Sequence, residues 1–211
     1  EHLALLAASG ADLLGTTLPE IQLPALSLDA TGVLRLYLTA GDGAPTAPVS
    51  APRLFALFEP HDPAGRPDEQ TARLHPEPVA PFASGRKTAN YWLNCAAQTS
   101  ARQAGCHHAL LADHDGNLLS AAFGNLFFVL DGQLCTPSLA LAVRPGVIRS
   151  RLMQDQTVRE VKFPAARLPE ASELFLTNSR LGVMPLQCEA ITPGPLGRAL
   201  RATFLRENIV P

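Results

Sequence analysis

Hydrophobic and polar positions alternate along two short segments near the start of the chain. In residues 32–41 (GVLRLYLTAG), Leu34, Leu36 and Leu38 fall on one face of an extended chain, and mostly polar side chains fall on the other. Because successive side chains of a strand point to opposite faces, this period of two predicts a half-buried strand. Residues 53–60 (RLFALFEP) predict a second strand.

A period near 3.6 residues predicts helices elsewhere in the chain. The first such pattern ends at Gly15 and the second at Gly105, and glycine is favoured just beyond a helix C-terminus because it adopts the left-handed conformation without strain. In a third pattern Pro145 stands near the start, where its missing N–H is tolerated. The predicted helices cover residues 1–14, 90–104, 144–156 and 196–207.

Short apolar runs separated by turn residues predict strands in the second half of the chain. Turns are expected at Asp131-Gly132 and in the Asp-His-Asp-Gly run at residues 113–116. The strands are expected at residues 108–113, 118–122, 125–130, 133–137, 158–163, 173–179 and 182–191. Since helices and strands do not alternate strictly, the pattern favours a mixed α+β fold over a regular βαβ one.

Composition narrows the classes of protein to consider. The chain has 211 residues, 46% of them hydrophobic, which suits one large domain or two small ones with a real core. Its net charge of −2 gives no strong field for nucleic acid or an anionic membrane. It also lacks a run of about 18 apolar residues that could span a bilayer. We therefore expect neither nucleic acid nor a membrane among its partners.

The first residues carry no basic leader and no initiator Met, so they do not predict a signal peptide. This start favours a fragment or a processed product. The four cysteines, Cys95, Cys106, Cys135 and Cys188, form no C-x-x-C pair. Their apolar surroundings predict buried free thiols in a reducing compartment, for which the cytoplasm is the default.

Candidate chemistry begins in the stretch SGRKTANYWLN, where Lys87 stands directly before the second predicted helix. Most lysines are solvated surface groups, and that is the plain interpretation. The alternative is a lysine that forms a Schiff base, which must present a neutral amine near pH 7. Its neighbours Gly85, Thr88 and Ala89 carry no carboxylate that would hold it charged, so both interpretations stay open.

Two further segments could bind an anion. In RPGVIR, a helix is expected to begin, and the free N–H groups of Val147 and Ile148 together with the helix dipole favour a negative charge. In FLTNSRLGVMP, a strand runs into a polar turn, where Thr177, Asn178 and Ser179 together supply hydroxyls, an amide and backbone N–H groups. Taken singly, each segment could equally be an ordinary structural element.

A short segment also gathers His107, His108, Asp113, His114 and Asp115. Histidine and aspartate are good ligands for zinc or manganese, so a metal site is conceivable. However, adjacent residues of a strand point to opposite faces, and the Asp-His-Asp-Gly run is typical of a hairpin turn. The sequence therefore favours a turn with surface histidines and no metal.

Taken together and in order, these segments resemble the fold-type IV family of pyridoxal-phosphate enzymes. That family includes branched-chain aminotransferases, D-amino-acid aminotransferases and 4-amino-4-deoxychorismate lyases. The matching stretches are EHLALLAASGADLLG, GVLRLYLTAG, KTANYW, NLFFVLDGQLCTPSL, RPGVIRSRLM and ELFLTNSRLGVMPL. The resemblance covers nearly the whole chain, and KTAN and TNSRLGVMP look most like the lyase branch.

The resemblance implies a fold and a set of site residues. It implies a small α/β domain at residues 1–83, incomplete relative to the family, and a larger cofactor-binding domain at 84–211 with a barrel-like sheet, flanking helices and a homodimeric assembly. Lys87 would be the catalytic residue, forming the Schiff base with pyridoxal 5′-phosphate and moving the proton at the substrate α-carbon. The implied cofactor-binding residues are Lys87, Tyr91, Ser120, Val147, Ile148, Asn178 and Ser179.

Two positions depart from the family pattern. Ser120 stands where the family has a glutamate that pairs with the pyridine nitrogen, and a hydroxyl cannot supply the balancing negative charge. Leu5 stands where the family has a phosphate-binding arginine. These departures predict weak cofactor binding, or its loss.

Three functions follow from the resemblance. The first is a lyase that forms 4-aminobenzoate and pyruvate for folate synthesis. The second is a class IV amino-acid aminotransferase, which would likewise act on a small amino-acid-like substrate. The third is a degenerate family member that binds a partner without catalysis.

Overall fold

The computed structural model describes residues 1–15, 32–42, 49–60, 67–80 and 85–206. The chain divides into two compact units, one ending at Ala64 and the other beginning at Gly65. The predicted domain boundary, at residues 83 and 84, lies outside the described residues. In the second unit, β3 (Gln70–Leu74) is a strand of a large sheet.

The first unit contains α1 (His2–Leu14), β1 (Gly32–Thr39) and β2 (Arg53–Pro60). Gly15 ends the helix in the left-handed conformation, and its N–H donates to the Ala11 carbonyl at 2.9 Å. The two strands pair antiparallel along their whole length. The helix and both strands were predicted from the sequence, and the structure confirms them.

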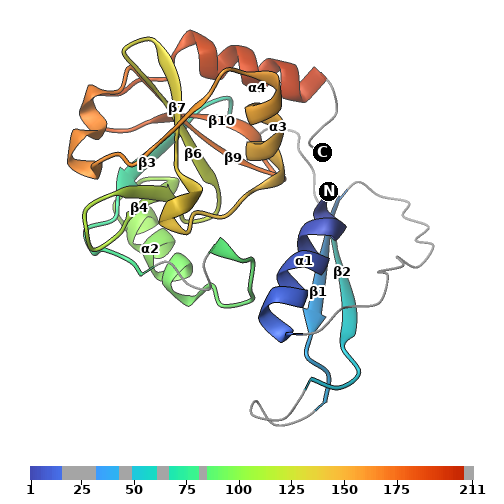
Figure 1. Cartoon of the computed structure of the whole chain (residues 1–211). Coiled ribbons are helices and arrows are strands. Elements are labelled where there is room, and N and C mark those ends of the chain that lie inside the picture. The colour runs from blue at the N-terminus through green and yellow to red at the C-terminus, as the bar shows by residue number, and fades with distance from the viewer. Residues whose placement is uncertain (16–31, 43–48, 61–66, 81–84, 207–211) are drawn as a thin grey trace. The chain divides into compact units, whose positions relative to one another are not determined.

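The second unit is built on an eight-stranded sheet in the order β5-β4-β3-β10-β9-β6-β7-β8 (Figure 1). Its two outer strands approach each other, because the Leu118 N–H donates to the Phe163 carbonyl and the Ala165 N–H donates to the Gly116 carbonyl, each at 2.8 Å. The sheet therefore curls into a barrel-like form, as the resemblance implied. Its other strands are β4 (His108–Ala112), β5 (Leu118–Ala121), β6 (Asn125–Leu130), β7 (Gln133–Pro137), β8 (Arg159–Val161), β9 (Glu173–Asn178) and β10 (Gly182–Gln187).

Among the described residues, the helices that accompany this sheet are three α-helices and the 3-10 helices η2 and η3. The third α-helix begins at Val147 rather than at 144, because Gly146 takes an extended conformation as its N-cap and Pro145 lies before the first turn. The α-helices are α2 (Trp92–Gln103), α3 (Val147–Asp155) and α4 (Pro195–Arg206), and the 3-10 helices are η2 (Leu139–Leu141) and η3 (Ala165–Glu170). No helix among the described residues is long and apolar enough to cross a membrane.

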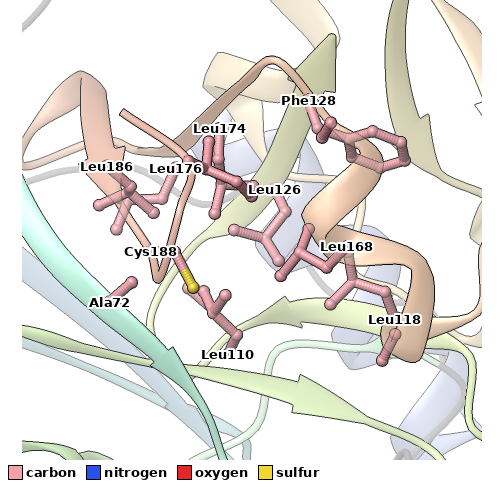
Figure 2. Close-up of a cluster of buried hydrophobic side chains, with 14 of the residues drawn as sticks. Ala72, Leu110, Leu118, Leu126, Phe128, Leu168, Leu174, Leu176, Leu186 and Cys188 are labelled. Atoms are coloured by element: carbon pink, nitrogen blue, oxygen red, sulfur yellow. The ribbon is translucent and has the colours of Figure 1, made fainter. Parts of the chain in front are cut away.

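Alternate residues of the central strands fill the two faces of the sheet. On β6, Leu126 and Phe128 enter the cluster inside the curled sheet, which Figure 2 shows, whereas Phe127 faces the other way. Phe127 stacks on Phe175 of β9 at 5.7 Å between ring centroids, within a second cluster that includes Ile148 of α3. Each fully buried aromatic side chain contributes about 2–3 kcal/mol through removal of its apolar surface from water.

The cysteines are only partly as predicted. Cys135 and Cys188 are buried free thiols, but Cys95 is exposed and Cys106 is half-buried. Cys95 is exposed because it lies on the outer side of α2, whose inner side packs through Ala97 and other small residues.

Candidate functional site

Lys87 lies in the segment directly before α2, four residues ahead of Tyr91. Its amino group donates a hydrogen bond to the Tyr91 hydroxyl at 2.7 Å and sits 5.0 Å from the centroid of that ring. Tyr91 is the N-cap residue of α2, and its carbonyl accepts the N–H of Cys95 at 2.8 Å. The first turn of the helix therefore holds the phenol where the lysine can reach it.

A second pair of contacts connects Tyr91 to the polar turn after β9. The Tyr91 ring stacks on Phe123, with 5.7 Å between the ring centroids. The Asn178 side-chain amide donates to the Phe123 carbonyl at 2.9 Å, while its oxygen accepts the N–H groups of Arg180 and Leu181. Three of the residues expected at the site, Lys87, Tyr91 and Asn178, are thus linked through Phe123.

The start of α3 is held in place by Asn125 of β6. The Asn125 side-chain amide donates to the Arg144 carbonyl at 2.7 Å. Gly146 packs so closely on the Asn125 side-chain oxygen that a Cβ at this position would collide with it. Since Gly146 offers no side-chain cap, the first N–H groups of α3, including those of Val147 and Ile148, point out of the helix end without intrahelical partners.

Thr177, which the sequence predicted as part of the polar turn but not as a cofactor-binding residue, is buried on β9. It pairs directly with Asn125 across β9 and β6, so both side chains lie on the face that carries Ile148 and the rest of the α3 cluster. Thr177 is 1% exposed, and its hydroxyl has no hydrogen-bond partner among the described residues. An unpaired buried hydroxyl is unfavourable, which marks this position as a site for a polar ligand.

Two positively charged side chains, Lys87 and Arg144, act on Tyr91 at this site. Burial acts to raise the pKa of Tyr91, but the hydrogen bond and charge of Lys87, together with the charge of Arg144 and a hydrogen bond from it, lower that pKa overall. Within the described part of the chain, neither Lys87 nor Arg144 forms an ion pair with a carboxylate.

Ser120 and Ser179 are the remaining predicted site residues. Ser120 lies half-buried on β5, paired with Leu111, and the described contacts include none between Ser120 and Lys87. Ser179 is exposed in the turn that Asn178 organises. The structure therefore brings together Lys87, Tyr91 and Asn178, and it places the start of α3, which carries Val147 and Ile148, against Asn125, the cross-strand partner of Thr177.

The histidine-rich segment forms no group of three or more potential metal ligands among the described residues. Asp113 instead accepts the N–H groups of Asp115 and Asn117 at 3.0 and 2.7 Å, which confirms the predicted hairpin turn. His107 accepts the Thr71 N–H at 3.2 Å through its Nδ1, and His108 pairs with Gln70. Both histidines thus bind β3.

Comparison with known sequences identifies one family. The sequence profile of the family "Amino-transferase class IV" matches residues 8–187. A protein of Methanocaldococcus jannaschii, provisionally named a branched-chain-amino-acid aminotransferase, is 26% identical over 164 residues, covering 72% of this chain and 57% of that protein. This chain therefore spans just over half the length of that relative.

Solved structures share the fold. A Legionella pneumophila protein provisionally named 4-amino-4-deoxychorismate lyase has a TM-score of 0.74 at 20% identity, over 84% of this chain and 70% of that one. A branched-chain amino acid aminotransferase from Thermobaculum terrenum, solved in its PLP-form, has a TM-score of 0.68 at 20% identity, over 82% and 62%. These likenesses confirm the expected fold class.

Proposed function

We propose, from the premise that the chain belongs to the amino-transferase class IV family, that it is a pyridoxal-phosphate-dependent lyase of the 4-amino-4-deoxychorismate type. Such an enzyme forms 4-aminobenzoate and pyruvate. The observation that carries the proposal is the hydrogen bond between Lys87 and Tyr91 at 2.7 Å, in a cationic site without a carboxylate partner among the described residues.

The residues at the start of α3 fit a phosphate group. The N–H groups of Val147 and Ile148 lack an intrahelical partner, and a helix N-terminus favours an anion through its dipole. The buried Thr177 hydroxyl, unpaired among the described residues, would donate a further hydrogen bond. We propose that these groups, with the turn at Asn178 and Ser179, hold the cofactor phosphate.

Lys87 would supply the amine that links to the cofactor carbonyl. When bound, pyridoxal phosphate withdraws electrons from the bonds at the α-carbon of an attached amino compound. Lys87 then takes or returns the proton at that carbon, which requires its neutral form. The Tyr91 hydroxyl accepts a hydrogen bond from Nζ and so positions the amine at the start of α2.

The choice between lyase and aminotransferase rests on the relatives. The Legionella structure and the KTAN and TNSRLGVMP stretches favour the lyase, whereas the archaeal relative favours an amino-acid aminotransferase. In either case the substrate is a small amino-acid-like molecule, and we propose a homodimer as the working assembly.

Ser120 favours a second candidate function, a family member that binds without catalysis. A hydroxyl supplies no negative charge to the pyridine nitrogen, so the electron-withdrawing power of a bound cofactor would be reduced. The retained Lys87 and the buried Thr177 hydroxyl, which has no hydrogen-bond partner among the described residues, argue for the enzyme.

Cofactor addition tests the proposal. The chain contains two lysines, Lys87 and Lys162, and Lys162 is exposed beyond β8. Incubation with pyridoxal phosphate should give a near-visible absorption band that borohydride abolishes, with the reduced label on Lys87 in peptide mass analysis. Lys87→Ala should lose the band and Lys162→Ala should keep it. A band that survives Lys87→Ala would refute the assignment.

Activity assays then separate the candidate reactions. Release of pyruvate from 4-amino-4-deoxychorismate supports the lyase, and transfer of an amino group from a branched-chain amino acid to 2-oxoglutarate supports the aminotransferase. A Lys87-linked band with neither activity supports the binding protein.

Ser120→Glu should tighten cofactor binding if Ser120 faces the pyridine nitrogen, and unchanged binding would show that it does not.

A further inference from the structure

Arg144 occupies a fixed position two residues before the N-cap of α3. Its carbonyl accepts the Asn125 side-chain amide at 2.7 Å and the Gly146 N–H at 3.0 Å. Both contacts hold the backbone of Arg144, so its side chain begins beside the first turn of this helix.

The positive charges of Lys87 and Arg144 both act on Tyr91. The Lys87 amino group contacts the Tyr91 hydroxyl at 2.7 Å. Burial acts to raise the pKa of Tyr91, and the charge of Arg144 adds to that of Lys87 in lowering it. Two cations that act on one phenol favour an anion nearby.

An independent observation concerns the hydrogen-bond donors near the start of α3. Thr177 is almost fully buried, and its hydroxyl lacks a partner among the described residues. It is the cross-strand partner of Asn125, whose side chain binds the Arg144 carbonyl. The hydroxyl, the free N–H groups of α3 and the guanidinium are all hydrogen-bond donors. Donors without acceptors fit an oxyanion with several acceptor oxygens.

We propose that Arg144 binds the phosphate of the cofactor, together with the first N–H groups of α3 and the Thr177 hydroxyl. The inference rests on the proposed function. A planar guanidinium donates two parallel hydrogen bonds to such an oxyanion. A substrate carboxylate is the other oxyanion that Arg144 could bind. The phosphate is favoured because Asn125 connects Arg144 both to the uncapped start of α3 and to its cross-strand partner Thr177.

Equilibrium binding of two probes tests this assignment. Pyridoxal 5′-phosphate and pyridoxal differ only in the phosphate, and quenching of the single tryptophan, Trp92, next to Tyr91, reports on both without any turnover. Arg144→Gln should weaken binding of pyridoxal phosphate about ten- to a hundredfold and change pyridoxal binding less than about twofold, as expected for loss of a charged hydrogen bond. Arg144→Lys should recover part of the loss. Arg167→Gln, which removes an exposed arginine paired with Glu170, is the matched control and should leave both affinities unchanged.

Each other result overturns the assignment. Equal weakening of both probes would show that Arg144 acts through Tyr91 or through the fold, and unchanged binding of both would show that it does not touch the cofactor. If Arg144→Gln weakens binding of an amino-acid substrate but not of the matching amine, and leaves both probes unaffected, Arg144 binds the substrate carboxylate instead. If the wild-type protein forms no Lys87-linked band, the proposed function itself fails; if it does and Arg144→Gln binds both probes normally, only this inference fails.

Discussion

The amino group of Lys87 lies 2.7 Å from the hydroxyl of Tyr91, four residues further along the chain. The contact joins a flexible lysine to a phenol that is itself stacked on Phe123. Because the ammonium stabilises the phenolate, the pKa of Tyr91 is lower than that of a free tyrosine even though burial opposes the shift. The same contact restricts where the lysine can present its amine.

Removal of Lys87 should therefore raise the pKa of Tyr91. The chain has two tyrosines, so Tyr37→Phe leaves Tyr91 as the only phenol, and its ionisation can be followed by ultraviolet difference spectroscopy. Adding Lys87→Met to Tyr37→Phe should shift the titration of Tyr91 to higher pH. Adding Lys162→Met instead should leave it in place. An unshifted titration in the Lys87 variant would show that the contact does not persist in solution.

Local patterns predicted most of the elements that support this site. The run NLFFVL predicted β6, and the glycines after α1 and α2 predicted where those helices end. Lys87 could be selected from the sequence because the segment around it matched a family in combination with distant segments. These features depend on residues close together in the chain.

Features that depend on pairing between distant strands could not be predicted. Nothing in the sequence indicates that Asn125 and Thr177 are cross-strand partners, so the unpaired Thr177 hydroxyl was not expected. The position of β3 between β10 and β4 is likewise set by non-local pairing. The apolar run of β6 is buried on both faces, so its periodicity could not show which residues face α3.

Glu173 of β9 should stabilise α4 across the sheet. Its carboxylate accepts the N–H groups of Leu196 at 3.2 Å and Gly197 at 2.9 Å, in the first turn of the helix. Glu173→Ala leaves both donors unpaired and should lower the free energy of unfolding by about 2 kcal/mol. Urea unfolding followed by circular dichroism measures this loss. Glu170→Ala, which removes an exposed carboxylate on η3, should leave the midpoint unchanged, and equal midpoints for both variants would exclude the capping role.

The four cysteines should react with thiol reagents in a fixed order. Cys95 is exposed on α2, whereas burial raises the pKa of Cys188 to about 11, with smaller contributions from Glu189 and Cys106. Because the thiolate is the reactive form, iodoacetamide at pH 8 should label Cys95 first and Cys106 more slowly. Cys135 and Cys188 should be labelled only in denaturant. Peptide mass analysis over time measures the order, and early labelling of Cys188 in the folded protein would contradict its burial.

His108 should make the stability of the protein depend on pH. Burial lowers its pKa to about 4, and the charges of His107 and Arg102 add to this effect, while its Nε2 pairs with Gln70 at 2.5 Å. In the unfolded chain the pKa of histidine returns to about 6.5, so between these values the unfolded state binds more protons than the folded state. The stabilisation is therefore complete above about pH 6.5 and is lost as the pH falls towards 4, by about 2–3 kcal/mol for this partly buried group.

Urea unfolding at pH 7 and pH 5 measures this loss. His108→Gln cannot be protonated, so the difference in unfolding free energy between the two pH values should shrink in this variant relative to the wild type. His114→Gln, in the exposed hairpin turn, removes an unburied histidine and should leave the difference as it is. If His108→Gln and the wild type lose stability equally on acidification, the imidazole of His108 is solvated in the folded protein, and the packing of β4 against β3 around it is looser than the structure shows.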